Sequence, residues 1–228
     1  MRVFDRMAAQ LAVFDVNETL SDMAPIAGRF ADIGAPQQLA PLWFAGLLRD
    51  GFALTAAGSS ERFAALADGA LRTVLHRVEL NRDLDAAVEH VLAGFAELPV
   101  HPDVPDGIRG LRVTGHRLVT LSNGSTDIAR RLLETAGLRG EFERLLSVEA
   151  AGVWKPAPGA YAYAARICGT DPGDMMLVAV HPWDIDGASR SGLTTAWINR
   201  TGAPYPGYCR RPDYTVTGLD QLAKALDG

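Results

Sequence analysis

Short apolar runs that alternate with helical segments constrain the fold of this chain more than any other feature. Strands separated by helices form parallel βαβ units, so this pattern predicts an α/β fold with a parallel sheet. A Gly-, Pro- and Tyr-rich loop at 202–212 leads to a short edge strand at 214–216. The other predicted elements are strands at 118–121, 145–148, 175–180 and 194–198, and helices at 127–136, closed by Gly137, and at 158–167.

The first predicted strand, at 11–16, differs from the others because a long helical stretch follows it. Over residues 41–99 the apolar positions recur at helical spacing and form two stripes. The stripes consist of Leu71, Val74, Leu75 and Val78, and of Leu84, Val88, Val91, Leu92 and Phe95. We therefore predict a helical insertion after the first strand, with a core at 1–20 and 98–228 and a helical cap at 21–97.

Length, charge and cysteine usage restrict the kinds of partner. A chain of 228 residues suits one domain with a sizeable insertion or two small domains, and its formal charge of -5, with both signs interspersed, offers no basic face to nucleic acid or membrane. Cys168 and Cys209 lack the spacing of a disulfide framework or a zinc site. We expect no signal peptide after Arg2, Asp5 and Arg6, a cytoplasmic location, and small solutes as partners.

Four polar segments stand at or near strand ends, where an open parallel sheet binds its ligands. Asp15 ends the first strand and precedes a loop of backbone N–H groups, so it can attack an electrophile while those donors hold an anion. Ser122 and Asn123 follow another strand and form a donor cluster for a carboxylate or phosphate. Taken singly, an Asx-turn or helix N-cap for Asp15, and an ordinary turn for the other two, are the commoner interpretations.

The remaining two segments carry opposite charges. Pro156 keeps Lys155 outside a helix, where its ammonium can neutralise an anionic nucleophile. Asp184 opens a helix just after a strand that ends at His181. Each of these also has a plainer interpretation: a solvated lysine, a helix N-cap and a core histidine.

Together and in this order, the four segments resemble the four motifs of the haloacid dehalogenase superfamily. The resemblance covers nearly the whole chain and implies a Rossmann-like core with a helical cap, and a homodimer. The residues that look like the type II L-2-haloacid dehalogenases are Lys155-Pro156, Tyr161, Trp183-Asp184, Gly187-Ala188 and Trp197-Ile198-Asn199-Arg200.

This resemblance implies a two-step hydrolysis. Asp15 displaces halide from the α-carbon of a short 2-halo acid, and water then attacks the carbonyl of the resulting aspartyl ester. The resemblance implies that Thr19 hydrogen-bonds the Asp15 carboxylate and that Lys155, oriented by Tyr161, offsets its charge. Asp184, helped by His181, would position the hydrolytic water. The implied substrate-binding groups are the N–H groups of Val16 and Asn17, the side chains of Ser122 and Asn123, Tyr161, and Phe44, Phe63 and Trp183 at the apolar pocket.

Two positions differ from the magnesium-dependent phosphatases of the superfamily. These enzymes carry an aspartate as general acid and base at the position of Asn17, and a metal-binding aspartate at the position of Val180. An amide cannot donate and recover a proton in that role, and an isopropyl group offers no oxygen to a hard cation. We therefore predict no metal and no cofactor.

Three further departures concern the substrate. Type II dehalogenases receive the halide on an arginine at the position of Phe44, and have Asn at His181 and Ser at Ala179. Arg49 or Arg62 from the cap, or a cationic His181, are the candidate replacements for the arginine.

Several function classes therefore stay open. We predict a 2-haloacid dehalogenase; the alternatives are a hydrolase of another small anionic substrate, such as a phosphate ester, and a non-catalytic binding protein on the same scaffold. The joint presence of Asp15, Lys155 and Asp184 favours an enzyme.

Overall fold

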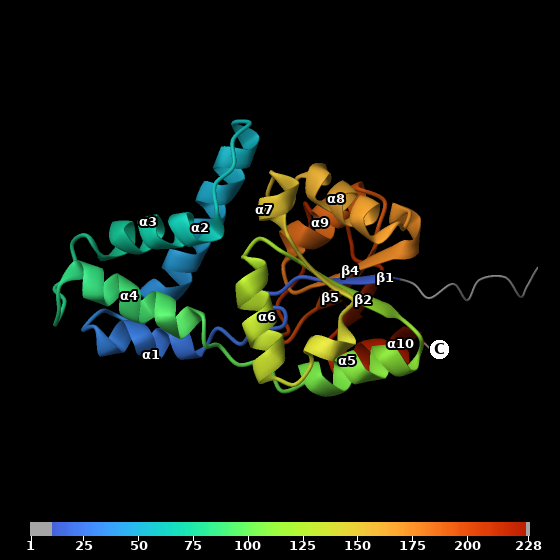
Figure 1. The fold of residues 1–228 in the computed structure, drawn as a ribbon, viewed down its shortest axis with the longest axis horizontal. Helices are drawn as coiled ribbons and strands as arrows, with labels where there is room; N and C mark the ends of the chain where they lie inside the picture. Colours follow the sequence, from blue (N-terminus) through green and yellow to red (C-terminus); the bar gives the residue numbers. More distant parts are fainter. Residues whose placement is uncertain (1–10, 227–228) are drawn as a thin grey trace, which may run out of the picture.

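A parallel sheet forms the centre of the protein (Figure 1). The computed structural model describes residues 11–226. The strands are β1 Leu11–Phe14, β2 Arg117–Ser122, β3 Arg144–Ser147, β4 Met175–Ala179, β5 Thr194–Ile198 and β6 Tyr214–Val216. They lie in the order β3-β2-β1-β4-β5-β6 and every neighbouring pair is parallel. This order is the Rossmann one, so the predicted fold class is confirmed.

Alternate side chains of β1 decide which helices cover which face of the sheet. Ala12 and Phe14 pack against one set of helices, whereas Leu11 and Val13 pack against the other. The first set is α5 Val104–Val113, α6 Thr126–Thr135 and α10 Leu219–Leu226; the second is α8 Pro158–Cys168 and α9 Pro182–Arg190. Short elements complete the core: α7 Val148–Ala151 and the 3-10 turns Arg139–Glu141 and Pro172–Asp174.

A helical insertion follows β1, as predicted, and gathers beside the sheet (Figure 1). It consists of α1 Pro25–Asp32, α2 Leu39–Ala56, α3 Phe63–Leu75 and α4 Leu84–Phe95. Its apolar side chains form a cluster of their own, which includes Val148, Trp154 and Ala160 from the core. The exact division at 21–97 stays a prediction.

Two kinds of difference separate the predicted elements from the observed ones. Strands β1, β3 and β4 end one or two residues early, because the residues after them turn away to build loops; Ser147, for example, caps α7 by accepting a hydrogen bond from the Glu149 N–H. The helix at α5 was not predicted, since it contains two glycines. Gly107 is needed there, because a Cβ atom would lie 2.4 Å from the Cβ of Leu219 in α10.

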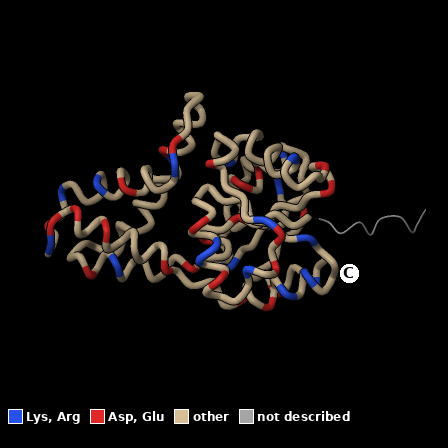
Figure 2. Tube along the Cα trace, in the orientation of Figure 1, with Lys and Arg blue, Asp and Glu red and all other residues tan. Residues whose placement is uncertain are grey.

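Charged residues of both signs alternate along the insertion and the core (Figure 2). Within residues 11–226, no helix combines the length and the apolar character that a bilayer span requires.

Candidate active site

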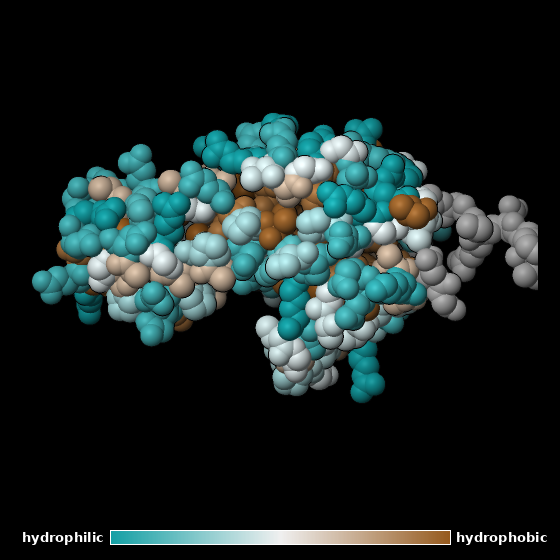
Figure 3. All heavy atoms as spheres, turned by 90° about the horizontal axis from the view of Figure 1, so that it is seen from below, coloured by the Kyte–Doolittle hydropathy of each residue, from teal (hydrophilic) through white to brown (hydrophobic). Residues whose placement is uncertain are grey.

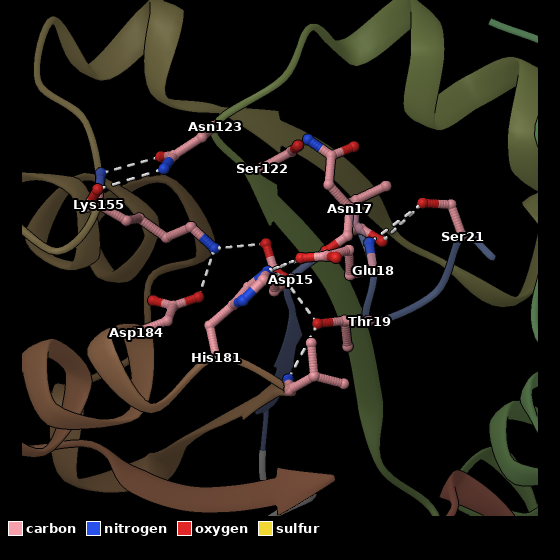
Figure 4. A network of polar contacts seen from close by, with 12 residues as sticks. Asp15, Asn17, Glu18, Thr19, Ser21, Ser122, Asn123, Lys155, His181 and Asp184 are labelled. Atoms are coloured by element: carbon pink, nitrogen blue, oxygen red, sulfur yellow. Dashed lines mark hydrogen bonds and ion pairs between the residues drawn. The ribbon is translucent and has the colours of Figure 1, made fainter. Parts of the chain in front are cut away.

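A lysine and two aspartates meet at the carboxyl ends of β1 and β4 (Figure 4). Asp15 follows β1 directly, Lys155 lies in the loop before α8, and Asp184 lies in the first turn of α9. The Lys155 Nζ atom is 2.9 Å from Asp15 Oδ1 and 2.6 Å from Asp184 Oδ2. All three side chains are buried, Lys155 and Asp184 completely. The ammonium group thus joins two carboxylates that are shielded from bulk solvent.

Burial and charge set the ionisation of this triad. Burial disfavours the charged form of Lys155, but the carboxylates of Asp15 and Asp184 raise its pKa above the ordinary value. Burial also opposes ionisation of Asp15, yet Lys155, His181 and the Thr19 hydroxyl hold its pKa below the ordinary value. Burial raises the pKa of Asp184, to which the negative charge of Asp15 adds. The two carboxylates are therefore distinct: Asp15 is an anion suited to attack, and Asp184 binds a proton more readily.

Hydroxyl groups hold each carboxylate from the other side. Thr19 Oγ1 donates to Asp15 Oδ2 at 2.7 Å and accepts the Val180 N–H at 3.1 Å. Tyr161 Oη donates to Asp184 Oδ1 at 2.6 Å. Tyr161 thus contacts Lys155 only through Asp184, and its predicted role in orienting Lys155 stays a prediction.

Asn123 fixes the position of Lys155 through the main chain. Its Oδ1 accepts the Lys155 N–H at 3.0 Å, and its Nδ2 donates to the Lys155 carbonyl at 3.2 Å. The peptide bond between Lys155 and Pro156 is cis. Ser122 Oγ accepts the Gly124 N–H at 2.8 Å and so shapes the turn beside Asn17. The predicted binding of a substrate carboxylate by Ser122 and Asn123 stays a prediction.

His181 faces the opposite side of the nucleophile (Figure 4). Its Nε2 atom lies 3.7 Å from Asp15 Oδ2, 3.4 Å from Glu18 Oε2 and 3.3 Å from the Asn17 carbonyl oxygen. The ring stacks on Trp183 with 4.9 Å between centroids. Sequence reasoning missed Glu18, because a glutamate in a loop carries no signal of its own; its backbone φ of 62° is unusual for a residue with a side chain.

The surroundings of Asp15 do not fit a divalent cation such as the magnesium of the phosphatases. A hard cation would use oxygens such as Asp15 Oδ2 and the Asn17 carbonyl, but the His181 ring nitrogen faces both. The Lys155 ammonium already lies between the two aspartates. Among residues 11–226, no group of three or more acidic, histidine or cysteine side chains is arranged to hold a metal.

The helical insertion contributes aromatic rings. Phe63 stacks on Phe95 and on Trp154, with centroids 5.3 Å and 6.2 Å apart. Phe44 is buried beside Phe95, inside the insertion's apolar cluster. Trp183, half-buried in the core, lies with its ring centroid 6.0 Å from Lys155 Nζ. We call Phe44, Phe63, Phe95 and Trp154 the aromatic wall.

Neither candidate arginine of the insertion reaches Asp15. Arg49 is exposed and pairs with its neighbour Asp50, and Arg62 is exposed at the start of α3. Neither of the two candidates, Arg49 and Arg62, thus contacts the site in this structure, and the group that replaces the arginine at the position of Phe44 stays open. Across the described part of the chain, neither guanidinium has a hydrogen bond or ion pair with Asp15, Lys155 or Asp184.

Two hollows adjoin the site. Figure 3 shows apolar atoms in the seam between the insertion and the core, and a narrow pocket there is lined by Val16, Asn17, Phe95 and Ile128, among others. A larger cavity of about 450 Å³ has Glu18 and His181 in its lining. The site thus has a narrow pocket on the side of the insertion and a larger one beside His181.

An arginine from the end of the sheet holds the loop after the nucleophile. Arg200 donates to the Thr19 carbonyl at 3.0 Å and to the Glu18 carbonyl at 3.4 Å. Asp103 accepts from the same guanidinium at 2.9 and 3.0 Å. This pair gives Arg200, noted in the sequence only as part of a motif, a positioning role.

Comparisons with known proteins agree with this arrangement. A profile of the haloacid dehalogenase-like hydrolases matches residues 9–192. The chain is 32% identical to the (S)-2-haloacid dehalogenase of Pseudomonas sp. (strain YL), over 94% of this chain and 93% of that protein. It is 30% identical to haloacetate dehalogenase H-2 of Moraxella sp. (strain B), over 93% and 96% of the two chains.

A solved structure shows the same fold. The L-2-haloacid dehalogenase from Xanthobacter autotrophicus with chloropropionic acid covalently bound superposes with a TM-score of 0.86. It covers 96% of this chain and 99% of the other, at 24% identity. The structural similarity therefore includes both the sheet and the helical insertion.

Proposed function

The chain belongs to the haloacid dehalogenase-like hydrolases, and from that membership we propose that it hydrolyses the carbon–halogen bond of short 2-halo acids without a metal ion. One observation carries the proposal: a buried ammonium joins the ionised Asp15 to Asp184. The names of its relatives, (S)-2-haloacid dehalogenase and haloacetate dehalogenase, support this substrate class. The covalently bound chloropropionic acid of the Xanthobacter autotrophicus enzyme supports an ester intermediate.

In the first step, Asp15 Oδ1 attacks the α-carbon and halide leaves from the far side. The lowered pKa of Asp15 keeps it ionised, and Lys155 balances its charge. Holding the carboxylate and the carbon in line contributes roughly 7–11 kcal/mol toward lowering the barrier. The N–H groups of Val16 and Asn17, together with Ser122, would bind the substrate carboxylate.

In the second step, water attacks the ester carbonyl carbon of Asp15. Asp184 accepts the water proton, since its raised pKa suits a general base. The bond between this carbon and Oδ1 then breaks, and Oδ1 leaves with the product as its hydroxyl oxygen. The released alkoxide takes up the proton from Asp184. The rebuilt Asp15 carboxyl, which now contains an oxygen from water, loses the second water proton to solvent and is a carboxylate again.

Aromatic rings take the place of the arginine that receives the halide in the type II dehalogenases. The edges of aromatic rings carry partial positive charge, so they can face an anion more favourably than aliphatic groups can. We assign binding of the halogen to the aromatic wall, with Phe63 as its main contact, both while the halogen is bonded to carbon and after it has left, so the wall contributes mainly to substrate binding. Three of its four rings lie in the cap, residues 21–97, and Trp154 comes from the core. The apolar cluster of the cap is largely separate from the two clusters of the core.

Halide release tests the function. We expect release from chloro- and bromo-substituted 2-halo acids, unchanged by a chelator, and none from Asp15→Asn. A single turnover in heavy-oxygen water should leave the label on Asp15 and not on the product. Absence of halide release from every acid, combined with magnesium-dependent hydrolysis of an aryl phosphate, would establish the alternative. Self-association as a homodimer and a cytoplasmic location stay predictions.

A further inference from the structure

His181 is held so that one ring nitrogen points at oxygen atoms. It immediately precedes α9, and its ring stacks on Trp183 at an interplanar angle of 18°. The nitrogen Nε2 faces Asp15 Oδ2, Glu18 Oε2 and the Asn17 carbonyl, at 3.3–3.7 Å. Because all of these atoms are acceptors, Nε2 carries a proton and acts as a donor.

The position of this donor favours the Asp15 carboxylate over the halide as its target. In an in-line displacement the halide leaves on the side of the α-carbon opposite the attacking oxygen. The His181 ring instead lies beside the Asp15 carboxylate itself, on Oδ2. We therefore assign His181 to the carboxylate, and its candidate role as a halide donor stays a prediction.

We propose that His181, held by Glu18, donates to Asp15 Oδ2 when the ester is hydrolysed, and so forms an oxyanion hole with Thr19. This inference rests on the proposed function and deepens it. Attack of water on the carbonyl carbon moves an electron pair onto Oδ2. The Thr19 hydroxyl already donates to this atom at 2.7 Å, and His181 approaches it from another side. When the carbonyl re-forms, the bond to Oδ1 breaks and the 2-hydroxy acid leaves.

The distance is compatible with this role. Oxyanion donors lie about 2.7–3.1 Å from the charged oxygen of the intermediate, and such contacts are often longer in a free enzyme. A closure of about 0.6 Å from the present 3.7 Å brings Nε2 within that range.

Glu18 is fixed in place to act on His181. Its N–H donates to Ser21 Oγ at 3.2 Å, and its carbonyl contacts His101 Nε2 at 3.0 Å and Arg200. These contacts hold a backbone of unusual φ and leave the carboxylate 3.4 Å from His181 Nε2. The Glu18 carboxylate faces the same ring nitrogen as Asp15 Oδ2 and the Asn17 carbonyl, so it holds the single Nε2–H among these acceptors, within reach of Oδ2. Glu18 is thus a positioning residue.

Trapping the ester tests this role. His181→Phe keeps a ring for stacking on Trp183 but removes the donor. With 2-chloropropionate, we expect one equivalent of chloride per enzyme at close to the wild-type rate, then turnover slowed about 10²–10³-fold. Mass spectrometry of the quenched variant should reveal an ester on Asp15. Glu18→Gln, which preserves the shape, should slow turnover about tenfold and also accumulate ester.

A second histidine–carboxylate pair supplies matched controls. His90 Nε2 lies 3.0 Å from Asp32 Oδ2 in the helical insertion, so His90→Phe and Asp32→Asn should turn over normally without accumulating ester. The inference is overturned if His181→Phe turns over at the wild-type rate, or if it loses the chloride burst along with turnover. Failure of the wild-type enzyme to release any chloride would instead overturn the proposed function.

Discussion

The two sides of the proposed active site consist of opposite kinds of side chain. The side toward the sheet, which we call the polar floor, consists of Asp15, Thr19, Lys155 and Asp184, linked by hydrogen bonds of 2.6–2.9 Å. The side toward the insertion is the aromatic wall, whose rings pack with centroids 5.3–6.5 Å apart. The aromatic wall and the polar floor are directly connected in the chain at one point, where Trp154 precedes Lys155.

This difference assigns different tasks to the two sides. A charged network positions and activates reacting atoms, because its atoms have few alternative arrangements. Packed rings exclude water and select by shape, and each contributes a small share of the energy. We therefore expect floor variants to change kcat and wall variants to change KM or stability.

Replacement of Lys155 should give the largest effect. Lys155→Met leaves two buried carboxylates without their counter-ion, so we expect unfolding free energy to fall by about 3–5 kcal/mol. Halide release should fall on the order of 10³-fold. Denaturant unfolding and a chloride electrode measure the two quantities.

The other lysine of the chain offers the control. Lys224 is exposed on α10, and Lys224→Met should change neither quantity measurably. If the Lys155→Met enzyme were active and stable, the expectation that the polar floor and the aromatic wall have different tasks would be contradicted.

Loss of the Tyr161 hydroxyl should have the next largest effect. Hydrogen bonds to charged groups contribute about 1.5–3 kcal/mol, so kcat of Tyr161→Phe should fall roughly 10- to 100-fold at neutral pH. Burial and Asp15 raise the pKa of Asp184, whereas the Tyr161 hydrogen bond lowers it, so the variant raises it further. Asp184 must be ionised to accept a proton, and activity is lost as pH falls through its pKa.

The acid limb of the kcat profile should accordingly move to higher pH in Tyr161→Phe. Tyr163, on the same helix α8, is partly buried and lies outside the floor. Tyr163→Phe should leave the acid limb in place. An acid limb that stays fixed in Tyr161→Phe would show that Asp184 is not the group that titrates.

The two aspartates of the polar floor could be predicted from the sequence because strand ends place them, whereas Thr19 came from the family resemblance. Asp15 and Asp184 follow strands that are adjacent in the sheet, so the parallel order alone brings them together. Lysine is also rare in this chain, with Lys155 and Lys224 among 22 basic residues. A compact ammonium fits between two carboxylates better than a guanidinium does.

Other contacts could not be predicted, because they depend on tertiary packing. The partner of Tyr161 is decided by Gly187, where a Cβ atom would lie 2.7 Å from the Tyr161 hydroxyl. The Glu18–His181 contact joins residues that are far apart in the chain. It also depends on the positive φ of Glu18, a backbone conformation that a glutamate does not predict. Helix α5 formed despite its glycines because α10 packs closely on it.

A smaller effect is expected where the insertion meets the core. A Cβ atom on Gly51 in α2 would lie 2.4 Å from a ring carbon of Trp154, so Gly51→Ala should destabilise the protein by about 1–3 kcal/mol. Gly46, on the same helix, has no heavy atom within 4 Å of its Cβ position, and Gly46→Ala should stabilise by about 0.5–1 kcal/mol.

The turnover of Gly51→Ala shows whether the steric strain at Trp154 also displaces Lys155 in the polar floor. The Lys155 main chain is held by Asn123, independently of the Trp154 ring. We therefore expect kcat of Gly51→Ala to remain within a few-fold of wild type. A collapse of kcat to the level of Lys155→Met would show that floor and wall act as one unit.

The smallest effect should come from a single ring of the wall. Phe63→Leu loses its stacking on Phe95 and Trp154, worth about 1 kcal/mol. We expect KM for 2-chloropropionate to rise about fivefold while kcat changes less than about twofold. Phe30→Leu changes a buried ring of the same cluster that packs on Trp43, so it should lower stability similarly and leave KM unchanged. A fall in kcat with constant KM would mean that the Phe63 ring acts on the transition state, and the wall would then share the task assigned to the floor.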